Sequence, residues 1–185
     1  MADKEKIEKA VHMILEAIGE NPARPGLIDT PRRVAEMYLE IFAGVGHEPA
    51  QELKLYPTDH HEMIIHRDIP FYSMCEHHLL PFWGTVSIAY IPKDAMVTGF
   101  SSLARIVRAF AQRPQLQETM ATGIADTIMA KLHPMGVFVV IRAQHQCLMM
   151  RGEKVQGSWT VTSAVRGALA NQATRLEALH LMDGR

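Results

Sequence analysis

Residues 81–91 have the sequence PFWGTVSIAYI, and this stretch decides the fold class of the chain. Within it, Val86, Ile88 and Tyr90 alternate with Ser87 and Ala89. Because successive side chains of a β-strand point to opposite faces of a sheet, this alternation predicts a strand with one buried face. The strand needs partner strands and its buried face needs a covering layer, and the segments before and after residues 81–91 must supply them.

Three further segments have the pattern of strands, at residues 63–71, 137–143 and 159–165. Two helices are predicted between them, one capped by Ser101 or Ser102 and ended by Pro114, the other spanning about 116–132. A terminal helix is expected after Leu169. Two strands, two helices and two strands predict an α+β fold, in which both helices cover one face of a four-stranded antiparallel sheet.

Two helices are also predicted ahead of the sheet. Apolar residues recur at helical spacing over 7–18, and Thr30 followed by Pro31 predicts the N-cap and first turn of a second helix. Residues 1–45 are therefore expected to form an N-terminal helical arm. About 60–185 would form the catalytic core, the two together making one domain of 185 residues.

Composition excludes several classes of partner. The chain is 48% hydrophobic and 21% charged with a net charge of −1, so no broad basic field attracts nucleic acid or a membrane surface. The longest purely apolar run, residues 137–141, is too short to span a bilayer. The charged N-terminus lacks the apolar core of a secretion signal. A cytoplasmic location is expected, which also suits two cysteines in a metal-ligand context.

The two cysteines predict a metal site. Cys75 and His78 form a Cys-x-x-His pair, and Cys147 lies 72 residues further on, two residues after His145. Two thiolates and one imidazole would leave a fourth position of a zinc ion free for water, with His77 and His145 beside it, which is typical of a catalytic site. The alternative is that both cysteines are small buried hydrophobes, as free cysteines often are.

Several motifs, in order along nearly the whole chain, resemble the GTP cyclohydrolase I family. They are SMCEHH at 73–78, AQRPQLQE at 111–118, His145-x-Cys147 followed by MRG at 150–152, TPRRVA at 30–35 and TVTS at 160–163. The resemblance implies the tunnelling fold, in which subunits join their sheets into a β-barrel ring. It further implies that two pentameric rings stack into a homodecamer, with active sites at subunit contacts.

The same resemblance implies the reaction and its cofactor. Zinc would be held by Cys75, His78 and Cys147, and water would add to carbon 8 of the guanine ring of GTP. Ring opening, release of formate and rearrangement of the ribose would then give 7,8-dihydroneopterin triphosphate, a precursor of folate-type or related pterin cofactors.

Three residues receive catalytic roles from the resemblance. His145 would give a proton to nitrogen 7, the alternative being a residue that only orients Cys147. His77 would assist opening of the ribose, unless it points away from the site. Ser101 would lie near the ribose, although a serine there could equally be a helix N-cap.

Substrate contacts are implied in the same way. Glu118 would accept two hydrogen bonds from the guanine edge, supported by Gln117, whereas a lone glutamate at a helix start otherwise suits the helix dipole. Arg105, Arg151 and Arg33 would bind the triphosphate, although each alone could be a solvated surface charge. The chain departs from many relatives at Ser102 and Glu36, where a lysine is common.

Two other functions remain open from the sequence. A paralogue could act on another purine nucleotide or stop at the ring-opened formamide. A ring-forming structural or regulatory protein could keep only a vestigial metal site, although such a site would need neither His77, His145 nor Glu118. The signature of zinc deaminases is missing.

Overall fold

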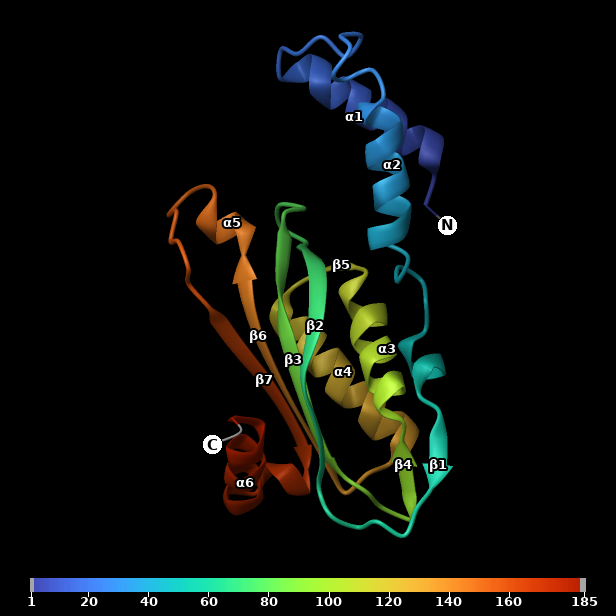
Figure 1. Cartoon of the computed structure of the whole chain (residues 1–185), viewed down its shortest axis with the longest axis vertical. Helices are drawn as coiled ribbons and strands as arrows, with labels where there is room; N and C mark the ends of the chain where they lie inside the picture. Colours follow the sequence, from blue (N-terminus) through green and yellow to red (C-terminus); the bar gives the residue numbers. More distant parts are fainter. Residues whose placement is uncertain (1, 184–185) are drawn as a thin grey trace.

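The computed structural model describes residues 2–183 and centres on one twisted antiparallel sheet (Figure 1). Its four long strands lie in the order β2-β3-β6-β7, and a two-residue strand, β5, pairs in parallel with the end of β2. The strands are β2 (Ile64–Cys75), β3 (Pro81–Ile91), β5 (Pro114–Gln115), β6 (Gly136–His145) and β7 (Thr160–Gly167).

Helices α3 (Phe100–Ala111) and α4 (Gln117–Leu132) cover one face of this sheet (Figure 1). The main core lies between the two layers, where side chains from both are buried together. Its largest fully buried members include Phe82, Ile88, Tyr90, Leu103, Ile106, Met120, Ile124, Ile128 and Ile141. The predicted α+β fold, four antiparallel strands with two helices on one face, is confirmed.

A second, smaller core lies on the opposite face. Helix α6 (Gln172–Asp183), preceded by a 3-10 turn η2 (Ala168–Ala170), packs Ala178 and Met182 against Phe138 and nearby side chains of the sheet. The expected terminal helix is therefore present.

The β3–β6 ladder is continuous, running from Phe82 opposite His145 to Ile91 opposite Gly136. Gly84 fits here because a Cβ atom on it would lie 1.8 Å from the carbonyl oxygen of Arg142, a separation no side chain tolerates. The β2–β3 ladder, in contrast, shifts register between His66 and Ile69. The register of β3 against β6 is thus uninterrupted, whereas that of β2 against β3 changes once.

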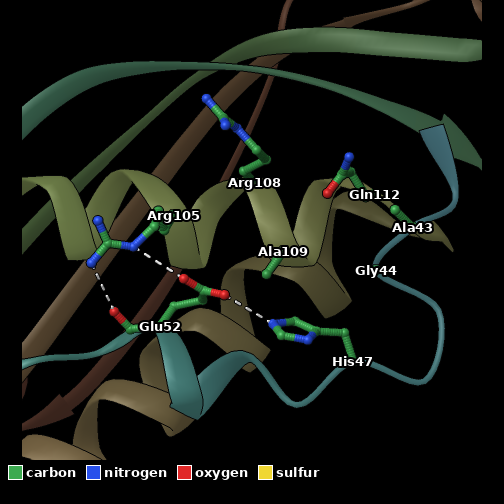
Figure 2. A pocket seen from close by; sticks show the side chains of 8 residues that line it. All are labelled: Ala43, Gly44, His47, Glu52, Arg105, Arg108, Ala109 and Gln112. Atoms are coloured by element: carbon green, nitrogen blue, oxygen red, sulfur yellow. Dashed lines mark hydrogen bonds and ion pairs between the residues drawn. The ribbon is translucent and has the colours of Figure 1, made fainter. Parts of the chain in front are cut away.

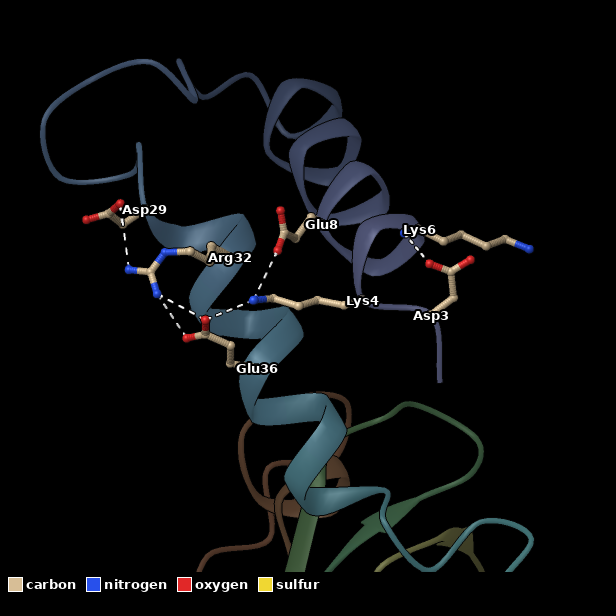
Figure 3. Close-up of polar contacts among 7 residues, drawn as sticks. All are labelled: Asp3, Lys4, Lys6, Glu8, Asp29, Arg32 and Glu36. Carbon is tan, nitrogen blue, oxygen red and sulfur yellow. Dashed lines mark hydrogen bonds and ion pairs between the residues drawn. The ribbon is translucent and has the colours of Figure 1, made fainter. Parts of the chain in front are cut away.

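The N-terminal arm consists of α1 (Lys4–Ala17) and α2 (Thr30–Ile41), which pack against each other beyond the end of the sheet (Figure 1). An exposed ion pair joins them, since Lys4 Nζ lies 3.0 Å from Glu36, and Arg32, on α2 itself, contacts the same carboxylate at 3.0 Å (Figure 3). The hydrogen bonds from Lys4 and then Arg32 lower the pKa of Glu36.

Two predicted helix caps are wrong, the first by one residue and the second by two or three. Asp29, not Thr30, is the N-cap of α2, and Thr30 is already helical. Gly99, rather than Ser101 or Ser102, precedes α3. Ser102 is buried and accepts hydrogen bonds from the backbone N–H of Lys54 and from Arg105, so its hydroxyl is used between elements instead of at a cap.

Besides β5 and η2, four short elements had no pattern in the sequence. They are η1 (Pro49–Glu52), β1 (Leu55–Pro57), β4 (Met96–Thr98) and α5 (Gln146–Met149), of which β1 and β4 pair as a separate two-stranded sheet. Within residues 2–183 there is no helix whose length and apolar character would allow it to cross a membrane.

Candidate metal centre and active site

The predicted metal ligands converge at one end of the sheet. Cys75 is the last residue of β2, His78 lies in the turn that follows, and Cys147 is in α5 immediately after β6. Because Phe82 pairs with His145, the β3–β6 ladder holds the segment after β6 beside the turn between β2 and β3. One ligand atom from each of the three residues lies within 4.8 Å of the other two.

Backbone hydrogen bonds fix the turn that carries two of these ligands. The N–H of Cys75 donates to the carbonyl of Leu80 at 2.9 Å, and the N–H of Leu79 donates to the carbonyl of Cys75 at 2.8 Å. The neighbouring strand β5 also holds this turn, because the N–H of Glu76 donates to the carbonyl of Gln115. The side-chain amide of Gln115 is buried and donates to the hydroxyl of Ser73 at 3.0 Å. Cys75 is therefore held from both neighbouring segments.

The two thiols influence each other. Burial first, and then the adjacent Cys75, raise the pKa of the Cys147 thiol. A second thiolate close by is unfavourable unless a cation lies between the two, and a divalent ion would relieve this repulsion. Both cysteines are free.

A cavity of about 260 Å³ adjoins the ligands. Its lining includes Cys75, His77, Glu118, His145 and Cys147. The structure thus brings together most of the residues to which the sequence assigned catalysis and base recognition. His77 and Glu118 are exposed to solvent, Glu118 in the first turn of α4.

His145 is held on two sides. Its ring stacks on Phe82 with a centroid separation of 4.8 Å and an angle of 4° between the planes. Its Nε2 lies 2.8 Å from Oε1 of Gln117. Burial lowers the pKa of His145, and the nearby Glu118 carboxylate partly opposes this.

Gln117 is buried, and its amide nitrogen donates to the carbonyls of Ile141 at 3.0 Å and Thr160 at 3.1 Å. All the polar atoms of its side chain are therefore engaged within the protein. Arg151, by contrast, is exposed, and its Nη1 lies 2.8 Å from Nε2 of His78. Arg151 is the one predicted phosphate contact found at the metal end.

The other two arginines lie elsewhere. Arg105 on α3 donates to the carboxylate of Glu52 at 3.0 Å (Figure 2). It also donates to the hydroxyl of Ser102 at 2.9 Å. It lines a second cavity, of about 280 Å³, which also includes His47 and shares no lining residue with the first. Arg33 on α2 is 71% exposed and pairs with Asp29.

Ser101 is exposed in the first turn of α3 and does not line the cavity at the metal end. Within one chain, Ser101, Arg105 and Arg33 are therefore not gathered with the metal ligands. Their assigned roles stay predictions.

Sequence reasoning missed Phe82 at the metal end and Glu52 at the second cavity. Phe82, which stacks on His145, has only the pattern of a core strand residue. Glu52, the partner of both Arg105 and His47, lies in a stretch without periodicity. The role of Phe82 is seen only once β3 is paired with β6, and that of Glu52 only in the tertiary structure.

The fold and this site define an α+β protein in which three side chains that could hold a metal ion lie beside a cavity. The family model described as GTP cyclohydrolase I matches residues 7–183. The chain belongs to the GTP cyclohydrolase I family and is an enzyme of it.

Three curated relatives match this chain over nearly their whole lengths. A protein of Carboxydothermus hydrogenoformans named GTP cyclohydrolase 1 is 60% identical over 98% of this chain and 96% of its own. One of the same name from Pelotomaculum thermopropionicum is 58% identical, with 100% of both chains covered. A third, from Clostridioides difficile, is 55% identical over 97% of this chain and 96% of its own.

Proposed function

We propose that this enzyme hydrolyses the imidazole ring of GTP, releases formate and forms 7,8-dihydroneopterin triphosphate. The observation that carries the proposal is the convergence of Cys75, His78 and Cys147 beside a cavity lined by His145 and Glu118. The name shared by the full-length relatives supports the same substrate.

Zinc is the proposed metal. Two sulfur donors and one imidazole nitrogen within 4.8 Å of one another suit zinc, which binds such ligands tetrahedrally and leaves one position for water in catalytic sites. When bound, zinc supplies a hydroxide near neutral pH by lowering the pKa of water to about 7. Cys75, His78 and Cys147 would hold it.

Glu118 would select the base. Its carboxylate can accept hydrogen bonds from the ring N–H and the exocyclic amine of guanine, a pair of donors that adenine does not offer. Glu118 is exposed at the rim of the cavity, where a base can reach it. At the other wall, His145 would exchange the proton that nitrogen 7 gains as water adds to carbon 8.

The remaining residues of the metal end would handle the ribose and phosphates. His77, exposed on the turn after β2 and lining the cavity, would assist opening of the ribose ring. Arg151, exposed beside His78, would bind the triphosphate through its guanidinium group.

Ser101, Arg105 and Arg33 would serve the site of a neighbouring copy in a homo-oligomer, for which the family implies a decamer of two pentameric rings. Support comes from their separation from the metal end of their own chain and from the solvent exposure of Ser101 and Arg33. No nucleic acid or membrane partner is proposed, and free cysteines at a metal site suit the cytoplasm.

One assay tests the function. Zinc-loaded protein is incubated with GTP, with and without a chelator, and the products are identified by mass. Formate and a pterin that becomes fluorescent after oxidation are expected only without chelator. Absence of both would exclude the proposed reaction, and a ring-opened formamide without formate would indicate an enzyme that stops at the first hydrolysis.

A further inference from the structure

The hydrogen-bond partners of the Gln117 side-chain amide fix which end of the amide is oxygen and which is nitrogen. Two carbonyl oxygens, those of Ile141 and Thr160, lie 3.0 and 3.1 Å from one end of its amide. Only the nitrogen can donate to both, since a reversed amide would set its oxygen against two other oxygens. The amide oxygen therefore faces His145.

The orientation of Gln117 sets the tautomer of His145. An amide oxygen only accepts hydrogen bonds, so Nε2 of His145, 2.8 Å away, must carry a proton. A neutral imidazole has one protonated nitrogen, and Nδ1 of His145 is then the unprotonated one. The tautomer follows from a buried glutamine that has no other arrangement of its bonds.

Nδ1 of His145 is the nitrogen left for chemistry. It makes none of the hydrogen bonds found within residues 2–183 and is not among the buried atoms that lack a partner there, so it is accessible to solvent. The stack on Phe82, with ring planes at 4°, opposes tilting of the ring. His145 also lines the cavity beside the metal ligands.

We propose that Gln117 is a positioning residue, which acts through His145 and not through the guanine edge. It holds neutral His145 with the proton on Nε2, so that Nδ1 is the atom that exchanges protons with the reactants. This inference rests on the proposed function and assigns a task within it.

The proton balance of the first hydrolysis follows directly. Nδ1 accepts a proton as an O–H bond of the attacking water breaks and the new C–O bond forms at carbon 8. The same N–H bond then breaks as nitrogen 7 gains that proton, so water has added across the carbon 8–nitrogen 7 bond. The Nε2–H bond to Gln117 strengthens while His145 is positively charged, because a charged donor makes the stronger hydrogen bond.

Kinetics of Gln117→Leu separate the two possible tasks of Gln117. If it positions His145, kcat falls while KM for GTP and zinc content stay unchanged, because the lost interaction matters only in the transition state. The fall should lie between about tenfold and the ~10⁴-fold upper range of general acid–base catalysis. A raised KM with unchanged kcat would overturn the proposal and return Gln117 to the guanine edge.

Nitrogen-15 NMR tests the tautomer without any turnover. Protein labelled at histidine is sedimented and measured by magic-angle spinning, and the His145 signals are those missing from His145→Ala. Neutral wild-type His145 should show protonated Nε2 and unprotonated Nδ1, whereas Gln117→Leu should show a mixture. A proton on Nδ1 in the wild type would overturn the proposal, even if the enzyme turns over GTP as expected.

Gln115→Leu is the matched control for lost buried hydrogen bonds. Gln115 is also buried and donates to Ser73 and to the carbonyl of Phe110, but it does not contact His145. The Gln115→Leu variant should lower the melting temperature as Gln117→Leu does, and it should leave the His145 tautomer unchanged. A changed tautomer in Gln115→Leu would count against a specific role for Gln117. If Gln117→Leu does not fold, the wild-type spectrum alone still tests the proposal, because a proton on Nδ1 there would overturn it.

Discussion

The metal end of the sheet and the N-terminal arm are held by different kinds of contact. At the metal end, segments far apart in sequence are joined by a strand ladder and by buried side chains such as Gln115 and Gln117. The arm is two helices with few buried residues, and an exposed ion pair between Lys4 and Glu36 joins them. Exposed ion pairs contribute little to stability, so substitutions should have large effects at the metal end and small ones in the arm.

The largest effect is expected for Cys147→Ala. Removing one of three ligands should abolish metal retention and turnover together, since the remaining pair cannot hold zinc in the same way. Zinc is measured by elemental analysis after dialysis. Ser158→Ala, in the loop after α5, is the control and should keep its metal. Tight zinc in Cys147→Ala would remove Cys147 from the ligand set.

His145→Ala should separate metal binding from chemistry. Zinc should stay, because His145 is not a proposed ligand, while ring opening slows by about 10²–10⁴-fold with the loss of the proton-exchanging group. Zinc content and formate release are measured on the same sample. His180→Ala, exposed on α6, should behave as the wild type. Normal product formation by His145→Ala would reassign the proton transfer.

Glu118→Gln should weaken selection of the base more than it slows the reaction. Replacing the carboxylate removes one of two acceptors for the guanine edge, and such a bidentate contact is worth about 1–3 kcal/mol of discrimination. The measurement is kcat/KM for GTP relative to inosine triphosphate, which lacks the exocyclic amine. An unchanged ratio would show that Glu118 does not contact that edge.

The smallest effect is expected in the arm, with Glu36→Gln. The pKa of Glu36 is lowered below its ordinary value of 4.5 by its hydrogen bonds to Lys4 and Arg32, so it stabilises the α1–α2 contact above that pH. This stabilisation is lost as the pH falls through the lowered pKa of folded Glu36. Near pH 7, hydrogen exchange of α1 should be faster in the variant than in the wild type, and the two should converge at low pH.

Glu40→Gln is the control for that comparison, because Glu40 lies on the same helix and its side chain makes none of the ion pairs found within residues 2–183. It should leave exchange unchanged. The melting temperature of the whole protein should change little in either variant. A large fall in melting temperature for Glu36→Gln would show that the arm is coupled to the core, and the contrast between the two regions would fail.

The sequence predicted the long elements because their periodicity is set by burial on one face. Val86, Ile88 and Tyr90 recur at every second position because they all lie in the main core, whereas Ala89 faces the second core on the other side of the sheet. Strands of two or three residues, such as β5 and β4, are too short to show a period. The helix starts were misplaced because Ser102 and Thr30 have the composition of caps, whereas Gly99 and Asp29 occupy those positions.

The metal triad could be suggested from residue types, but its convergence depends on which strands are neighbours. Nothing local shows that the segment carrying Cys147 lies beside the turn after β2. The task we assign to Gln117 was further out of reach, because a glutamine at a helix start has no pattern that reveals two strand carbonyls and a histidine as its partners. The resemblance to the family suggested instead that Gln117 supports the contact with the guanine edge.

The ladder of β3 and β6 also limits how the chain can change length. Deleting one residue from β6 would turn His145 to the opposite face of the sheet, and deleting two would draw Cys147 about 7 Å from its present place. Viable insertions and deletions in this protein should therefore fall in segments such as the loop between α5 and β7, while β6 keeps its length among variants that still bind metal.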